Sequence, residues 1–147
     1  MGKIAEVQEV TLKMLVPYER NAKLHSEEQI REIAESITEF GFINPILIDK
    51  DFNVIAGHGR IEAAKLLKLE AVPCVFVEGL TDEQRRAFIL ADNKLFELGS
   101  WNDINLETEV ENVSFDFESF NIGSDEEKDE EPKKIVCPRC GKEVRAE

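Results

Sequence analysis

Two glycines and an arginine stand close together in the run Gly57-His58-Gly59-Arg60. A short apolar stretch precedes this run and an alanine-rich stretch follows, which indicates a strand, a turn and a helix opening with Arg60. Glycine lets the backbone approach a ligand closely, and the first amides of a helix lack an intrahelical acceptor. Together with the guanidinium of Arg60, this turn predicts a phosphate or nucleotide site. The alternative is an ordinary strand-to-helix turn, because the third glycine of the dinucleotide motif and the P-loop lysine are missing.

Asp92 and Asn93 stand side by side in an otherwise helical stretch. Both residue types are unfavourable inside helices, since their side chains compete for backbone hydrogen bonds. The pair therefore predicts either a break between two short helices or oxygen ligands for a divalent cation. Beside such a cation, Glu62, His58 or Asp92 could serve as a general base. For His58 the alternative is an exposed turn histidine without a role.

Cys137 and Cys140 form a Cys-Pro-Arg-Cys-Gly run of the kind found in zinc-ribbon knuckles. One knuckle supplies only two of the four ligands that Zn²⁺ requires, and Cys74 in its apolar stretch is expected to be a buried hydrophobe. A closed zinc site therefore needs a second chain or a partner protein. A redox pair and a knuckle that binds nothing are the alternatives.

The elements that must position these residues follow from hydrophobic spacing. Capping boxes open two helices, at Ser26 and at Thr81, and three phenylalanines near residue 117 are expected to close the folded part. The expected strands cover residues 4–16, 46–48, 54–56 and 72–77. The four expected helices begin directly after residues 26, 59, 81 and 103.

Composition limits the function classes. The chain has 147 residues and a net charge of −13, most of it in residues 101–131, which carry twelve acids and one base. Such a protein is a poor nonspecific DNA binder. No apolar run is long enough to span a bilayer, so we expect no membrane contact and a cytoplasmic location. Arg20 and Lys23 are expected to be solvated surface charges.

Residues 5 to about 100 resemble the ParB/sulfiredoxin-like domain, the N-terminal domain of ParB chromosome-partition proteins. The resemblance rests on four runs in the family's order. They are Gly41-Phe42-Ile43-Asn44-Pro45-Ile46-Leu47-Ile48, Ala56-Gly57-His58-Gly59-Arg60-Ile61-Glu62-Ala63-Ala64, Val72-Pro73 and Leu90-Ala91-Asp92-Asn93. The last run, followed by Lys94 and later by Gly99-Ser100-Trp101, is similar to the compact form found in phages and mobile elements, often together with DNA methylation modules.

This resemblance implies an α+β fold with a small mixed sheet, and a bound nucleotide, CTP or ATP, with Mg²⁺. It implies phosphate binding by Asn44, Gly57, His58, Gly59 and Arg60, and Mg²⁺ binding by Asp92 and Asn93. The sequence departs from the family pattern at four positions, where Asn44 replaces glutamine, Gly59 and Phe96 replace arginines, and Asp92 replaces glutamate. The sulfiredoxin cysteine has no counterpart, because residue 58 is histidine, so sulfinic-acid repair is not expected.

We expect four parts: a ParB/sulfiredoxin-like domain (1–100), its helical extension (101–123), an acidic linker (124–134) and the zinc-ribbon-like knuckle (135–147). Three functions compete. The first is a nucleotide-binding module for DNA transactions, with DNA or a DNA-modifying protein as partner. The second is a metal-dependent enzyme, namely a nuclease, nucleotide hydrolase or small-molecule phosphotransferase that uses Asp92 and Glu62. The third is an adaptor, whose acidic tail and zinc knuckle recruit a partner or form a homodimer through Zn²⁺ bound by Cys137 and Cys140.

Overall fold

The computed structural model describes residues 1–21, 23–117, 120, 134–136 and 143–145. The acidic segment 124–133, Cys137 and Cys140 lie outside these residues, so the linker, the zinc site and the domain boundaries stay predictions. The elements are β1 (Lys3–Thr11), the 3₁₀ turn η1 (Leu12–Met14), α1 (Glu27–Phe40), β2 (Ile46–Ile48), β3 (Val54–Ala56), α2 (His58–Leu66), β4 (Ala71–Glu78), α3 (Asp82–Glu97), α4 (Asp103–Asn112), β5 (Lys134–Val136) and β6 (Glu143–Arg145).

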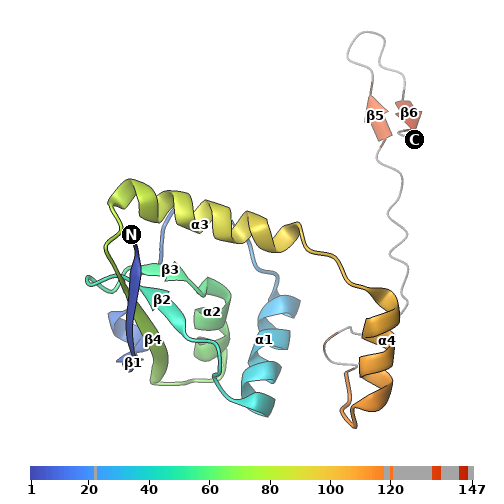
Figure 1. The fold of residues 1–147 in the computed structure, drawn as a ribbon, viewed down its shortest axis with the longest axis horizontal. Coiled ribbons are helices and arrows are strands. Elements are labelled where there is room, and N and C mark those ends of the chain that lie inside the picture. The colour runs from blue at the N-terminus through green and yellow to red at the C-terminus, as the bar shows by residue number, and fades with distance from the viewer. Residues whose placement is uncertain (22, 118–119, 121–133, 137–142, 146–147) are drawn as a thin grey trace.

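Four strands form one mixed sheet in the order β1-β4-β2-β3 (Figure 1). The central strand β4 pairs antiparallel with β1, where Val72 lies opposite Val10, and parallel with β2, where Val75 lies opposite Leu47. The hairpin of β2 and β3 is antiparallel. The expected α+β class with a small mixed sheet is thereby confirmed.

The core lies between this sheet and α2. Alternate side chains of the strands point toward the helix, as the two-residue period of a strand requires. Ala63 and Ala64 of α2 are fully buried, and their small side chains let the helix lie close to its neighbours, including α1. The main cluster consists of Val10, Leu15, Ile46, Ile48, Val54, Ile61, Ala64, Val72 and Cys74.

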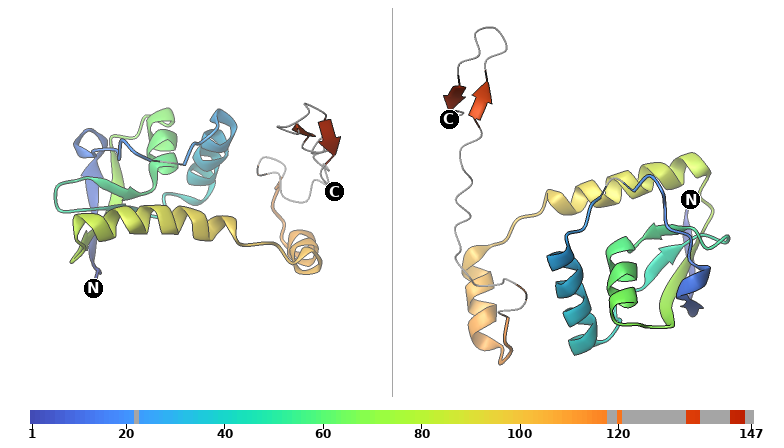
Figure 2. Two further views of the ribbon diagram at one scale, coloured as in Figure 1. Left: turned by 90° about the horizontal axis from the view of Figure 1, so that it is seen from above. Right: turned by 180° about the vertical axis from the view of Figure 1, so that it is seen from behind.

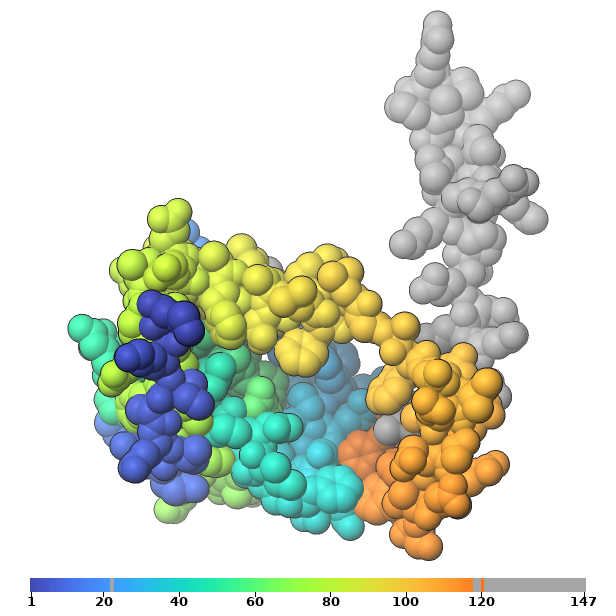
Figure 3. Space-filling model, viewed as in Figure 1, coloured from blue at the N-terminus to red at the C-terminus, as the bar shows by residue number. Residues whose placement is uncertain are grey.

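Helix α3 lies on the side of the sheet opposite α2 (Figure 2). Its N-terminus has the complete capping box that the sequence predicts, with Thr81 and Gln84 bonded to each other's backbone amides. Ile89 is the residue of α3 that is buried. Beyond it, the C-terminal part of α3 leads away from the sheet toward α4 (Figure 3). There Phe115 packs against Phe40 of α1, with ring centroids 5.2 Å apart, as expected for the closing phenylalanines.

Three local predictions are corrected. The first strand ends at Thr11 rather than continuing to residue 16, because the backbone turns into η1 and then places Leu15 in the core. Helix α2 begins at His58, two residues before Arg60. Helix α3 runs without a break through Asp92 and Asn93. None of the helices in the described ranges has the length and apolar surface needed to cross a lipid bilayer.

Candidate functional site

The turn between β3 and α2 requires glycine at residue 57. Gly57 is the N-cap of α2 and has a φ of 109°, a left-handed conformation that side chains disfavour. A Cβ atom here would also lie 3.1 Å from Cγ1 of Ile46. The first intrahelical bond runs from the amide of Ile61 to the carbonyl of Gly57, so the preceding amides of the first turn have no helical acceptor. This turn can therefore bind an anion with its backbone.

Arg60 is fixed beside this turn by the backbone that precedes β2. Its Nη1 donates to the carbonyl oxygens of Asn44, at 2.8 Å, and Pro45, at 2.6 Å. Burial lowers the pKa of the guanidinium, whereas the charge of Asp92 raises it, and an arginine remains charged under such a shift. Within the described part of the chain no acceptor is bonded to Nε or Nη2. The charge of Arg60 is thus held in place, with donors left for a ligand.

His58 connects the turn to the loop before α1. Its Nε2 accepts a hydrogen bond from the backbone amide of Tyr18, at 3.1 Å. Burial, and after it the charge of His25, lower the pKa of His58, while Glu62 acts in the opposite direction. A neutral imidazole is required for this bond, because a protonated nitrogen cannot accept. The structure therefore gives His58 a bond that holds the loop next to α2.

Helix α3 places Asp92 and Asn93 opposite the turn. Arg85 forms an ion pair with Asp49 in the β2–β3 connection, and Ile89 is buried one turn further along α3. Asp92 and Asn93 follow after one more turn and are half-buried. The helix break considered from the sequence is wrong, because these contacts hold α3 as one continuous element. A carboxylate and an amide oxygen suit a divalent cation.

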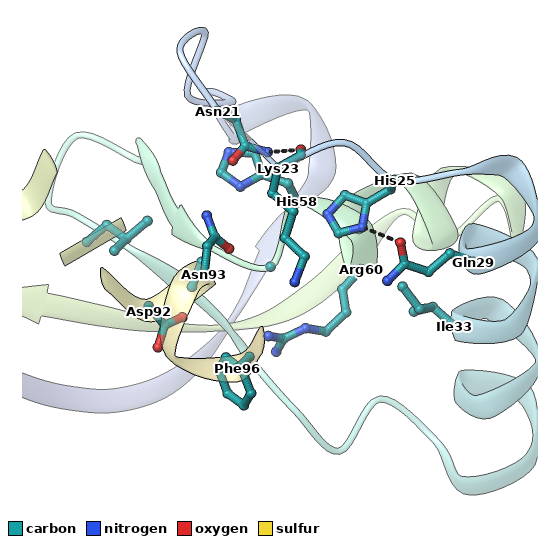
Figure 4. Close-up of a pocket in the computed structure, with 14 residues that line it drawn as sticks. Asn21, Lys23, His25, Gln29, Ile33, His58, Arg60, Asp92, Asn93 and Phe96 are labelled. Atoms are coloured by element: carbon teal, nitrogen blue, oxygen red, sulfur yellow. Dashed lines mark hydrogen bonds between the residues drawn. The ribbon is translucent and has the colours of Figure 1, made fainter. Parts of the chain in front are cut away.

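These elements enclose a cavity of about 210 Å³, with Arg60 and the turn on one side and α3 on the other (Figure 4). A second, more apolar cavity of about 410 Å³ adjoins it and shares Ile33 and Arg60. The first cavity, called the turn cavity below, is lined by Asn21, Lys23, His25, Gln29, Ile33, Ile55, Ala56, Gly57, His58, Gly59, Arg60, Asp92, Asn93 and Phe96.

The loop before α1 contributes three lining residues that sequence reasoning missed: Asn21, Lys23 and His25. The prediction of a solvated Lys23 is wrong, since Lys23 is half-buried in the cavity wall, whereas Arg20 is exposed as expected. One signal for His25 was its place directly before the capping serine of α1. Nothing local indicates that this loop reaches α2, because the contact joins segments about 35 residues apart.

Other predicted site residues lie elsewhere. Glu62 borders a neighbouring cavity and pairs with Lys65 at 2.8 Å. Asn44 offers its carbonyl to Arg60, and it lines the second cavity rather than the turn cavity. Cys74 is buried, as expected. Burial raises the pKa of its thiol to about 11, which disfavours the reactive thiolate. Among the residues that the structure describes, no three His, Cys, Asp or Glu side chains are grouped for a metal.

Comparison with known proteins gives one consistent family. The sequence profile of the ParB N-terminal domain matches residues 2–94. The ParB-like nuclease domain-containing protein YnaK of Escherichia coli (strain K12) is 51% identical over 75 residues, which cover 51% of this chain and 86% of that protein. The probable chromosome-partitioning protein ParB of Rickettsia bellii (strain RML369-C) is 29% identical over 116 residues, 78% of this chain and 38% of that protein.

Among solved structures, the C-terminally truncated chromosome-partitioning protein ParB of Caulobacter crescentus, complexed with CTP-gamma-S, has the same fold. The TM-score is 0.64 at 20% sequence identity, and the match covers 79% of this chain and 65% of that chain. The chain thus spans less than two thirds of either of these ParB proteins.

Proposed function

Because this chain belongs to the ParB N-terminal domain family, we propose that it binds the phosphates of a nucleotide, CTP or ATP, together with Mg²⁺. One observation carries the proposal: the turn cavity brings the glycine turn and Arg60 against Asp92 and Asn93, from segments more than 30 residues apart. Cations and free amides on one wall and oxygen ligands on the other are the groups that a magnesium–phosphate complex needs.

The phosphates would lie at the N-terminus of α2, near Gly57, His58 and Gly59. There the amides that lack a helical acceptor and the helix dipole favour negative charge. Arg60, held by two carbonyl oxygens, and Lys23 add two cations within a chain of net charge −13. A local positive site in a negative protein favours a small anion over a nucleic-acid backbone, because the remaining surface repels an extended polyanion.

Asp92 and Asn93 would hold the Mg²⁺. Magnesium is commonly bound by one or two protein oxygens and completed by substrate phosphates and water, so one carboxylate and one amide suffice. An ion held there would neutralise phosphate charge, as Arg60 and Lys23 would from the other wall. Asn44 contributes through its carbonyl, which positions Arg60.

The biological setting would be a DNA transaction, as in the partition proteins named above or in a phage or mobile element. Because the chain is strongly acidic, we propose that DNA is engaged through a partner, such as a DNA-modifying protein, rather than through this surface. Homodimer formation through Cys137 and Cys140 stays a separate prediction, to be checked by zinc content per chain.

A metal-dependent nuclease or phosphotransferase is the second candidate, and the relative YnaK carries the word nuclease in its name. Such an enzyme needs a base beside the bound cation. Glu62 faces a different cavity and pairs with Lys65, and His58 Nε2 accepts from Tyr18. Of these three predicted bases, Asp92 is the one left in the turn cavity, where the described part of the chain also places His25. The geometry therefore favours binding over bond cleavage.

A thermal-shift panel with CTP, ATP, GTP and UTP, each with Mg²⁺, tests the proposal. At a hundredfold excess over Kd, the correct nucleotide should stabilise the fold by about 2.7 kcal/mol. Arg60→Ala should abolish the shift, whereas Arg20→Ala, an exposed arginine of the nearby loop, should preserve it. Absence of a shift with every nucleotide would contradict the proposal. Mg²⁺-dependent DNA nicking that disappears in Asp92→Ala would instead favour the nuclease.

A further inference from the structure

His25 lies in the wall of the turn cavity with one of its two ring nitrogens already bonded. The residue stands in the loop directly before α1 and is half-buried. Its Nδ1 lies 3.0 Å from Oε1 of Gln29, in the first turn of α1. Because an amide oxygen only accepts, Nδ1 carries the hydrogen of this bond. The neutral ring therefore has its proton on Nδ1 and a lone pair on Nε2.

The ring is held against the turn on which the phosphates would lie. A Cβ atom on residue 59 would lie 3.0 Å from Cε1 of His25, the ring atom bonded to Nε2. Gly59 is buried in the first turn of α2, so its lack of a side chain leaves this space to the imidazole. In Figure 4 the ring projects from the loop toward Lys23, with its Nδ1 edge turned to Gln29. Nε2 is thus turned away from α1, toward the side of the cavity that Lys23 lines.

The neutral ring and a phosphate repel each other at Nε2. The lone pair of Nε2 would face phosphate oxygens, which are acceptors as well. Protonation of Nε2 by solvent converts the lone pair into an N–H donor and gives the ring a positive charge. A hydrogen bond between two charged groups is stronger than one between neutral groups. A phosphate on this turn therefore favours the protonated ring.

Ionisable groups of the loop, α2 and α3 surround His25. Those that share a cavity with it are Tyr18 and Lys23 of the loop, His58, Arg60 and Glu62 of α2, and Asp92 of α3. Helix α1 contributes the neutral Gln29 and Ile33 to the turn cavity. The charge of His25 lowers the pKa of His58, so the two imidazoles lie close enough to interact. Both signs of charge are present around the ring, and a phosphate would add negative charge on the cavity side.

We propose that His25 binds a phosphate of the nucleotide through its Nε2–H and takes up a proton from solvent when it does so. This inference rests on the proposed nucleotide site and adds a residue of the loop to the phosphate ligands. Arg60 keeps its charge throughout the range in which proteins are studied. An ordinary imidazole, in contrast, is mostly neutral above about pH 6.5 and must gain its charge on binding. Nucleotide affinity should therefore increase as the pH falls.

Isothermal titration of the full chain with CTP and with ATP, each with Mg²⁺, counts the protons. At about pH 7.5 the nucleotide phosphates are ionised, since the last ionisation of a phosphate lies near pH 6. Titrations in HEPES and in Tris, which differ in ionisation enthalpy, should show uptake of about half a proton or more per bound nucleotide. The chain has two histidines, so His25→Gln and His58→Gln form a matched pair. Uptake should disappear in His25→Gln, whose amide still donates, and persist in His58→Gln.

The pH dependence of affinity gives a second measure. The ratio of wild-type to His25→Gln affinity for the same magnesium nucleotide should rise by about fivefold or more from about pH 8.5 to about pH 6.5. Ionisation of the nucleotide itself cancels in this ratio. A purely structural role of His25 in the loop would instead change affinity by the same factor at every pH.

Three results would overturn the role of His25 and leave the nucleotide site intact. Wild-type binding without proton uptake does so without any variant, so the test does not depend on the folding of His25→Gln. Uptake that persists in His25→Gln and is lost in His58→Gln assigns the proton to His58. A constant affinity ratio across the pH range excludes a charged contact. A wild-type chain that binds neither CTP nor ATP overturns the proposed function, and this inference with it.

Discussion

The imidazole of His25 lies against the α-carbon of Gly59 on the first turn of α2. A Cβ atom on residue 59 would lie 3.0 Å from Cε1 and 3.2 Å from Nδ1 of His25. Gln29 holds the ring, with its Oε1 3.0 Å from Nδ1. The missing side chain at residue 59 thus gives the loop before α1 its place beside the phosphate turn.

This contact predicts an energetic coupling between the two residues. Gly59→Ala adds a methyl group that must displace the imidazole, although alanine is the better helix former. We expect Gly59→Ala to lower the free energy of unfolding by about 1–3 kcal/mol more in the wild-type chain than in a His25→Ala background. Urea unfolding of the four proteins measures this coupling. An equal effect of Gly59→Ala in both backgrounds would show that the ring moves aside freely.

Asp49 is predicted to be the anchor of α3. Its carboxylate accepts from the amides of Asp51 and Asn53, from the side chain of Asn53, and from Arg85. Asp49→Ala should lower the free energy of unfolding by about 2–4 kcal/mol, since it leaves several donors, most of them partly buried, without their acceptor. Asp51→Ala, at the exposed neighbouring acid, should change it by less than about 0.5 kcal/mol. Similar losses in both variants would contradict the anchor role.

The same carboxylate predicts a pH dependence. Burial alone would raise the pKa of Asp49, but the bonds from Asn53 and Asp51 and the charge of Arg85 together place it below its ordinary value. A carboxyl with a lowered pKa stabilises the fold above its unfolded pKa of about 4 and loses that stabilisation as the pH falls further. Unfolding measured from pH 6 to pH 3 should show this loss in the wild-type chain, and a shallower one in Asp49→Asn.

His58 predicts a second transition nearer neutrality. Because the pKa of His58 is lowered in the folded chain, the unfolded chain binds the proton at a higher pH as the pH falls. The contribution of His58 to stability is therefore complete above about pH 6.5 and declines below it. Protonation also removes the acceptor for the Tyr18 amide. Hydrogen-exchange protection of that amide, corrected for intrinsic rates, should therefore decrease between about pH 6.5 and pH 5. Unchanged protection in this range, with His58 shown by NMR to titrate, would contradict the bond.

Gly57 is predicted to be the least replaceable glycine of the turn. Gly57→Ala meets both a left-handed backbone and Ile46 at 3.1 Å, so it should lower stability by about 1–3 kcal/mol. At Gly99 the φ is not in the left-handed range and the nearest atom to an added Cβ is 3.7 Å away. Gly99→Ala is therefore the control, with a change of less than about 0.5 kcal/mol. Thermal unfolding of both variants checks the difference.

Local sequence was enough to predict the parts that short-range forces specify. The strand, glycine turn and helix around residue 57 follow from hydrophobic period and from backbone freedom at glycine. The starts of α1 and α3 follow from Ser26 and Thr81, whose side chains accept from amides three residues away. At α1, Gln29 turns to His25 instead of closing the capping box, a choice that sequence spacing does not show.

Tertiary structure alone decided the composition of the site. Asn21, Lys23 and His25 reach the turn because Tyr18 bonds to His58 and because Gly59 leaves room for a ring. Asp92 and Asn93 stay helical and face the cavity because contacts with the sheet fix α3 upstream of them. Such contacts depend on distances between remote segments, whereas residue type and spacing report only on neighbours within a turn or a strand. The sequence therefore determined which local elements form, and packing determined which side chains meet.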